Sequence, residues 1–241
     1  MAGTISQETS HAVYDDARRA YSDPDHPCHL FRTLQRKVPD AAWQLPEPFN
    51  GAAAAAGIVF LGLNPSYNPD EDVPTIVTPF EEWDAFYRHR LDGDPARWPL
   101  LYRRFQQLGQ VAVGHDFRLG RDGLVLEIVR FRSAKGEGIT EAVLAQERPL
   151  TRRLLRDVLP QVIVANGGAV LWELRRVFPA LAEKVPADYR MREVTGQIFQ
   201  VPWGDAAGQV RIVICPHLSG SFGLSQATLT ALAEAVGRAW R

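Results

Sequence analysis

The chain has little cysteine and almost no net charge. Its two cysteines among 241 residues, Cys28 and Cys215, lie far apart in the sequence. They cannot form a disulfide framework or supply the four thiolates of an iron–sulfur cluster. The 27 Lys and Arg residues balance 28 Asp and Glu residues to a formal charge of −1. The composition therefore does not indicate a generally basic nucleic-acid-binding protein, and any basic surface must be local.

Long hydrophobic runs are also absent. The first residues, MAGTISQETSHAVYDD, lack a basic segment followed by an apolar one, and no apolar run approaches the length of a membrane span. We therefore expect a soluble, cytoplasmic protein in a reducing compartment. The 46% hydrophobic content suffices for a sizeable core. We expect one domain over 51–241, with an N-terminal helical arm, 1–50, packed on it.

Four short apolar runs bounded by turn-forming residues predict buried parallel strands, at 57–63, 124–130, 161–165 and 210–215. Apolar residues at helical spacing lie in 147–160, 169–178 and 226–240. This alternation indicates βαβ units, so we expect an α/β fold: a three-layer α/β/α sandwich with a central four-stranded, mainly parallel sheet. The turn-rich DAAG between 197–204 and 209–215 also predicts a hairpin. The interval 66–122 is expected to be a long, partly helical crossover.

Chemistry in open parallel sheets collects just beyond the carboxyl ends of the strands, which here directs attention to 64–67, 130–135, 166–168 and 216–221. In GLNPSY, Asn64 either belongs to an ordinary turn, which Asn and Pro both favour, or is fixed by the rigid proline so that its amide holds a water. In PHLSGS, His217 is either structural or part of a site. Their placement in the same layer of the fold favours a shared site.

These two stretches resemble the signature motifs of the uracil-DNA glycosylase superfamily. GLNPS after the first strand resembles the GMNPG and GINPG forms of the single-strand-selective and mismatch-specific branches, and PHLSGS after the last strand resembles their HPSP and NPSG forms. ERPLTRRLLRDVLPQVIVANGGAVLWEL resembles the connecting helix, strand and small-residue turn. The likeness runs from about Gly57 to the last helix, and the order of the motifs strengthens it.

The resemblance implies a monofunctional DNA glycosylase of base-excision repair, which hydrolyses the N-glycosidic bond of a flipped-out uracil or other deaminated base without a metal or cofactor. Asn64 takes the position that orients the attacking water, and His217 the position that donates a hydrogen bond to the departing base. The expected partner is DNA containing a damaged base, and the protein is expected to be a monomer. Lysine is scarce and absent from both motifs, so a lysine nucleophile for strand cleavage is not indicated.

The resemblance also implies a set of surrounding contacts. The base would meet Leu63 and Tyr67 on the pocket floor and stack on Phe80. The expected DNA contacts are a basic rim, phosphate-binding serines and an intercalating wedge, namely Arg130, Arg132, Lys135, Ser66, Ser219, Ser221, and Phe222 or Leu224. Core packing is an equally good interpretation for the aromatic and leucine residues, and the arginine clusters are also typical of a solvated face.

Two residues depart from the family pattern. Glu127 lies within the apolar run LVLEIVR, close to where the best-known branch has an Asn that reads the polar edge of the base. It either reads a base edge that presents N–H donors, or forms a structural salt bridge with an arginine such as Arg130 or Arg132. Leu218 stands where the family usually has Pro, which we expect to loosen the second motif.

Two rival functions remain open from the sequence. The chain could be a catalytically silent member of the superfold that binds only nucleic acid or a nucleotide, which the near-zero charge and the motif departures favour. It could also be an unrelated nucleotide-handling hydrolase that shares only the sheet. The identity of the base and the preference for single- or double-stranded DNA are not encoded in any recognisable pattern.

Overall fold

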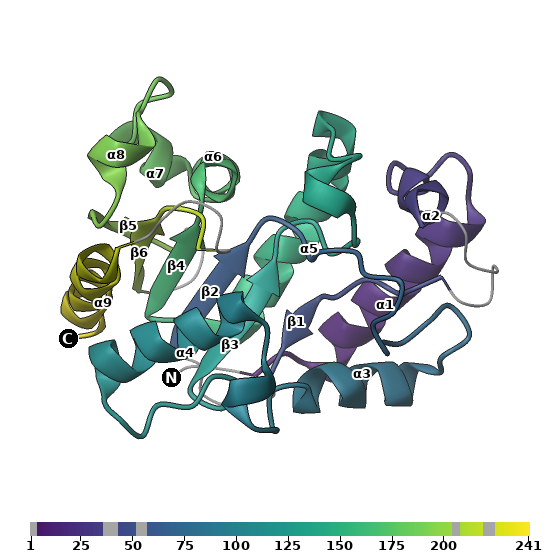
Figure 1. Ribbon diagram of the computed structural model, residues 1–241. Helices are drawn as coiled ribbons and strands as arrows, with labels where there is room; N and C mark the ends of the chain where they lie inside the picture. The colour runs from purple at the N-terminus through teal and green to yellow at the C-terminus, as the bar shows by residue number, and fades with distance from the viewer. Residues whose placement is uncertain (1–3, 36–42, 52–56, 204–207, 219–224) are drawn as a thin grey trace.

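The computed structural model describes residues 4–35, 43–51, 57–203, 208–218 and 225–241, and these form a mixed α/β structure built around one sheet (Figure 1). Within this part of the chain the sheet has six strands in the order β1-β3-β2-β4-β6-β5. The strands are β1 (Phe49–Asn50), β2 (Ile58–Gly62), β3 (Gly123–Glu127), β4 (Val162–Asn166), β5 (Ile198–Pro202) and β6 (Gln209–Cys215).

The four predicted strands are the four central ones, β3-β2-β4-β6, and they are parallel. The prediction of a four-stranded sheet is wrong, because β1 and β5 pair antiparallel at the two edges. The β5–β6 pairing confirms the predicted hairpin. β1 escaped prediction because two residues are too few to show a hydrophobic period.

Helices occupy the connections between these strands. They are α1 (Gln7–Ser22), α2 (Leu30–Leu34), α3 (Phe80–His89), α4 (Leu100–Val113), α5 (Glu141–Val158), α6 (Gly168–Val177), α7 (Pro179–Lys184), α8 (Met191–Val194) and α9 (Gln226–Trp240). Two begin at side-chain caps, with Thr140 accepting from the backbone N–H of Val143 and Ser225 from that of Thr228. Among the described helices, none combines the length and apolar character that crossing a bilayer requires.

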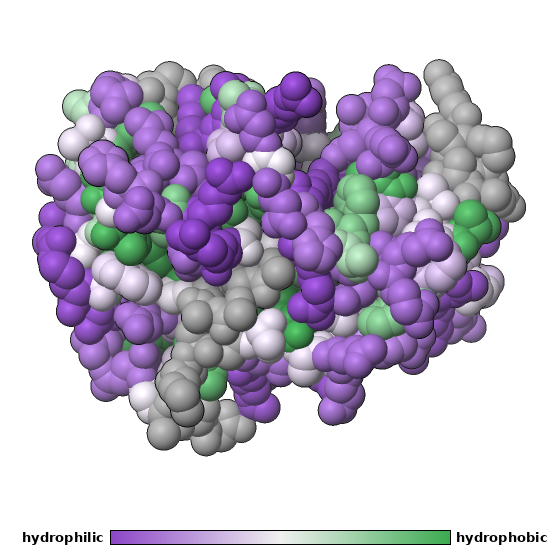
Figure 2. Space-filling model, turned by 90° about the horizontal axis from the view of Figure 1, so that it is seen from below, coloured by the Kyte–Doolittle hydropathy of each residue, from purple (hydrophilic) through white to green (hydrophobic). Residues whose placement is uncertain are grey.

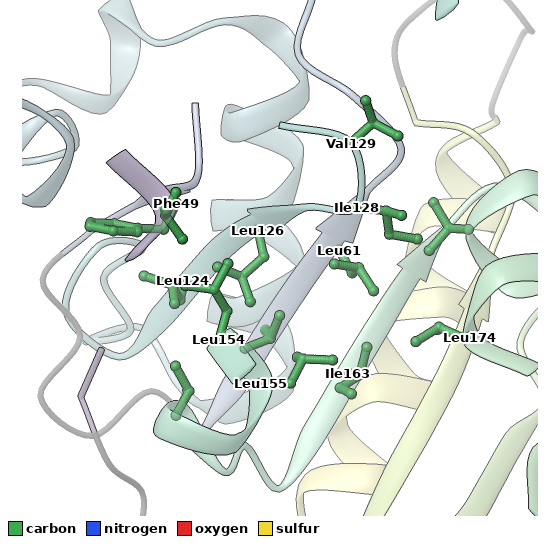
Figure 3. Close-up of a cluster of buried hydrophobic side chains, with 14 of the residues drawn as sticks. Phe49, Leu61, Leu124, Leu126, Ile128, Val129, Leu154, Leu155, Ile163 and Leu174 are labelled. Carbon is green, nitrogen blue, oxygen red and sulfur yellow. The ribbon is translucent and has the colours of Figure 1, made fainter. Parts of the chain in front are cut away.

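Both faces of the sheet are buried by helices, because alternate residues of each central strand point to opposite sides. One face packs against α5 and α6, and the other against α4 and α9. Figure 3 shows part of the first core, in which side chains of the sheet meet those of the two helices: Leu61, Leu124, Leu126 and Ile163 lie near Leu154, Leu155 and Leu174. The phenylalanine Phe60 belongs to the second core, stacked on Phe105 of α4 with ring centroids 4.5 Å apart.

The loops that leave β2 and β3 remain paired beyond the strands. The backbone N–H of Ile128 donates to Gly62 O (3.1 Å), that of Val129 to Leu63 O (2.8 Å), and that of Ser133 to Pro65 O (3.2 Å). These bonds fix the two loops side by side at the carboxyl edge of the sheet. The opposite end of the molecule, seen in Figure 2, is covered mainly by hydrophilic residues with small separate hydrophobic areas.

Candidate functional site

A row of four residues forms the last rung of the parallel sheet at its carboxyl edge. Gly62 of β2 lies opposite Glu127 of β3, and Asn166 of β4 lies opposite Cys215 of β6. Leu61 pairs with Ala165, so the next residues, Gly62 and Asn166, continue that register. Strand alternation places the four on the face that α4 and α9 cover, because Phe60 and Val125, two residues earlier on their strands, belong to that core.

The predicted water-positioning residue follows this row by two positions. Asn64 is half-buried, and its Nδ2 donates to Ser133 Oγ (3.0 Å) and to Pro65 O (3.1 Å). Ser133 itself lies on the loop after β3 and is buried. The amide is therefore held on its nitrogen side by the neighbouring loop, which leaves its oxygen as the group that can orient a water or an N–H donor.

The predicted leaving-group donor follows the row on β6. His217 is exposed, but neighbouring groups desolvate its imidazole enough to lower its pKa, so the neutral form is favoured near pH 7. It lies against Gly167, where an added Cβ would be 3.4 Å from His217 Cδ2. A neutral imidazole keeps one N–H, so the residue can donate a hydrogen bond without bringing a charge.

The residue after His217 is held more tightly than predicted. The backbone N–H of Leu218 donates to Asn166 Oδ1 (2.9 Å), and its carbonyl accepts from the Arg104 guanidinium. Its side chain is fully buried in the core beneath α4 and α9. The expectation that Leu218 loosens the second motif is wrong, because a proline here would lack the N–H that Asn166 binds.

Asn64 and His217 therefore emerge from the same edge of the sheet. Their strands, β2 and β6, are separated only by β4, and adjacent strands are about 4.8 Å apart, so the two strand ends are roughly 10 Å apart. The end of β4, with Asn166 and Gly167, lies between them.

Glu127 is the last residue of β3, whereas the sequence predicted a position in the middle of that strand. It is 4% exposed, and its Oε2 has no hydrogen-bond partner within the described residues. Burial raises the pKa of this carboxyl well above its usual range, the nearby charge of Glu47 adds to the effect, and Arg132 opposes it. The alternative of a structural salt bridge is wrong, because no ion pair joins Glu127 to an arginine in the described chain and both predicted partners bind other carboxylates.

No protein-family model matches this chain, and a search of curated proteins finds no relative. Its function must therefore be inferred from its own residues.

Arg130 does not belong to a phosphate-binding rim. It is 1% exposed, and it donates from Nε and Nη2 to the two carboxylate oxygens of Glu147 (2.7 Å each) and from Nη2 to Asp16 (3.2 Å). The guanidinium N–H groups of Arg130 already bind carboxylates from α5 and α1. The predicted DNA contact is wrong, because exposing this guanidinium would break a buried network.

Arg132 is likewise internal. It is 2% exposed, binds Glu47 and Glu71, and donates from Nη1 to the carbonyl of Ser66 (3.2 Å). Burial alone would raise the pKa of Glu47, but Arg132 and Arg90 outweigh it and hold the pKa below its usual range. The predicted phosphate contact is again wrong. Arg132 instead fastens the loop that carries Asn64.

Phe80 also has a different role from the one predicted. It begins α3, is 8% exposed, and its ring stacks on His11 with centroids 3.5 Å apart. Tyr14 and Trp83 pack on its other sides. The expectation that it stacks on a flipped base is wrong, because its faces are already covered.

The other predicted contacts stay predictions. Leu63 and Tyr67 are half-buried in the Asn64 loop, and the Tyr67 hydroxyl is buried with no hydrogen-bond partner in the described chain. Ser66 and Lys135 are exposed. The predicted contacts Ser219, Ser221, Phe222 and Leu224 lie outside the described residues. Among the described residues, no three His, Cys, Asp or Glu side chains gather as metal ligands would.

The predicted set of site residues did not include Asn166. Its location directly after a predicted strand was visible in the sequence, but its bond to Leu218, 52 residues later, was not. The signal that could have found it is a polar residue at the end of a buried strand next to two glycines.

Proposed function

We propose that this chain is a monofunctional DNA N-glycosylase that hydrolyses the bond between deoxyribose and a flipped-out uracil or other deaminated base. The observation that carries the proposal is the emergence of Asn64 and His217 from the same edge of the parallel sheet, on strands separated by one neighbour. The motif resemblance adds to it, and so does the α/β architecture with helices on both faces of the sheet.

The chemistry of the two side chains fits this reaction. A carboxamide is a weak base, but one held by Ser133 can orient water toward a sugar carbon that develops positive charge. A neutral imidazole can donate to the carbonyl oxygen of a base that leaves with negative charge. Leu63, Tyr67 and Glu127 would meet the base itself.

The experiment measures base release directly. Oligonucleotides containing uracil, hypoxanthine, xanthine or a 5-substituted uracil are incubated with the protein and then treated with hot alkali, which cleaves at abasic sites. Asn64→Ala and His217→Ala should each lower release by about 10²-fold or more, since removing one oriented group commonly has that effect. The matched controls are Asn68→Ala and His89→Ala, which alter exposed residues of the same types. Wild-type rates in the Asn64 or His217 variants contradict the mechanism.

A second function is favoured by one observation. Two of the three cations expected to meet phosphates, Arg130 and Arg132, are buried in internal ion pairs. This reduces the positive charge available for binding DNA phosphates and, within the alternative of a catalytically silent protein that binds a nucleotide or nucleic acid, favours the nucleotide. In the same assay, binding without strand scission for any of the four bases supports this second function.

A further inference from the structure

One arginine of α4 contacts the loop that carries His217. The guanidinium of Arg104 donates from Nη1 to the backbone carbonyl of Leu218, the residue that directly follows His217. Because Arg130 and Arg132 are bound to internal carboxylates, a DNA strand at this edge of the sheet needs other cations for its phosphates. Arg104 places a positive charge next to the predicted leaving-group donor.

The position of this guanidinium is fixed by the way in which Leu218 is held. The side chain of Leu218 is fully buried in the core beneath α4 and α9, and its backbone N–H donates to Asn166 Oδ1 (2.9 Å). Arg104 binds the remaining polar group of the same residue, its carbonyl. A group that is held in place before a ligand arrives loses less conformational freedom when it binds that ligand.

Most of the hydrogen-bonding capacity of Arg104 is unused within the part of the chain that the structure describes. A guanidinium has several N–H donors, and there the bond to Leu218 is the only one that its side chain makes, with no carboxylate in an ion pair. Arg104 is half-buried, so part of the residue is open to solvent. It can therefore meet an anion from outside without breaking an internal ion pair, which Arg130 and Arg132 cannot do.

The chemistry of a flipped nucleotide indicates which anion arrives here. Its base is joined through one sugar to the phosphates on either side, so a base that enters the site brings phosphate to the mouth of that site. His217 adds little charge of its own, because desolvation lowers the pKa of its imidazole. A guanidinium carries a permanent positive charge, and its planar N–H groups match the oxygens of a phosphate.

We infer that Arg104 binds a phosphate of the DNA strand at the candidate site, while its bond to the carbonyl of Leu218 holds the loop that carries His217. The inference rests on the proposed function, because it names a DNA contact of the same site. The two roles of Arg104 have different requirements: the bond to Leu218 needs an N–H donor, whereas the phosphate contact needs a positive charge.

The test measures binding of an oligonucleotide with a tetrahydrofuran abasic analogue, which has no base to release, by fluorescence anisotropy at several salt concentrations. Arg104→Gln keeps an N–H donor but removes the charge, so it should lower the slope of log affinity against log salt by about one. Arg104→Lys keeps the charge and should retain the wild-type slope. The matched control is Arg103→Gln, which removes an exposed charge from the same helix, roughly 100° around its axis, and should leave the slope unchanged.

The comparison of Arg104→Gln with Arg104→Lys does not depend on full stability, because both variants lose the guanidinium and only one loses the charge. Equal slopes for wild type and Arg104→Gln overturn the inference and leave Arg104 as an anchor of the loop. Equal reductions in Arg104→Gln and Arg104→Lys also overturn it, since the charge is then not what was lost. Absence of binding by the wild type overturns it as well.

Base release by the wild type, measured separately, tests the proposed function. Release combined with equal slopes for wild type and Arg104→Gln leaves the proposed function standing and removes the inference. No release, combined with a slope that falls only in Arg104→Gln, removes the proposed function and leaves Arg104 as the phosphate contact of a protein that binds DNA without cleaving it.

Discussion

The carboxyl group of Glu127 fills the space in which a side chain at Gly62 would begin. Glycine is therefore required at position 62 by its neighbour on the next strand and not by its own backbone conformation, since φ at Gly62 is not positive. The ends of β2 and β3 therefore pack against each other at these two residues, and a substitution of either residue affects the packing of the other.

Gly62→Ala should destabilise the fold and displace Glu127. Overpacking a filled core typically costs about 1–3 kcal/mol. Urea unfolding measures the loss, and Gly93→Ala is the control, because a Cβ there meets nothing within 4 Å. Equal unfolding midpoints for the two variants would contradict the close packing of Glu127 on Gly62.

The stability of the protein should depend on pH through the titration of the Glu127 carboxyl group. Its folded pKa is raised above the unfolded value, so its contribution to stability is present below the unfolded pKa of about 4.5 and is lost as pH rises through the folded pKa. Glu127→Gln removes this dependence, so the variant should gain stability relative to wild type as pH rises above 4.5. Unfolding curves at a series of pH values measure the difference, and parallel curves for both proteins would show that no raised pKa exists.

Replacing Arg130 should lower the free energy of unfolding more than it weakens DNA binding. Breaking one partner of a buried ion pair costs about 3–5 kcal/mol, because it leaves a buried charge unpaired. We expect Arg130→Met to approach this loss, and the joint change with Glu147→Leu to recover much of it. Arg121→Ala breaks an exposed pair with Asp122 and should leave the unfolding midpoint almost unchanged, because solvent screens exposed ion pairs. A stable Arg130→Met protein with weakened DNA binding would restore the phosphate-contact role.

Leu218→Pro should impair the site by releasing the loop that carries His217. Proline removes the N–H that donates to Asn166 Oδ1 and leaves that oxygen unpaired. Asn166→Ala removes the same bond from the other side, so both variants should lose base release to a similar degree. If Leu218→Pro retains wild-type release, the anchoring bond is dispensable.

DNA binding should depend on Lys135 and not on a buried arginine. Lys135 is exposed, and a lost phosphate contact lowers the slope of log affinity against log salt by about one. Lys135→Ala should show this reduction, measured by fluorescence anisotropy on an oligonucleotide at several salt concentrations. An unchanged slope would mean that the phosphates are met elsewhere.

The central strands could be predicted because parallel strands buried on both faces appear as continuous apolar runs. The same run concealed the end of β3: Ile128 and Val129 are apolar, so nothing in LVLEIVR marks Glu127 as the last residue of the strand. The positions of Asn64 and His217 at one edge followed from strand order, but the groups that hold them did not. Ser133 is 69 residues from Asn64, and Asn166 is 52 residues from Leu218.

Arginine roles were the hardest to predict. A sequence shows where a guanidinium is, but not whether a carboxylate distant in the chain meets it. Arg130 binds Asp16 across 114 residues, and Arg132 binds Glu47 across 85. Both arginines lie in the loop that follows β3, a place that a phosphate-binding surface and a buried ion-pair network can occupy equally well.

The bond between Asp16 and Arg130 also bears on how the chain assembles during synthesis. Asp16 of α1 is synthesised 114 residues before Arg130, its buried partner. Contacts of such long sequence separation form late, because loop closure precedes any gain from them. The ion pair between α1 and the loop after β3 can therefore form only once β3 has been synthesised, whereas the contacts of Tyr14 with Trp83 of α3 have a much shorter sequence separation.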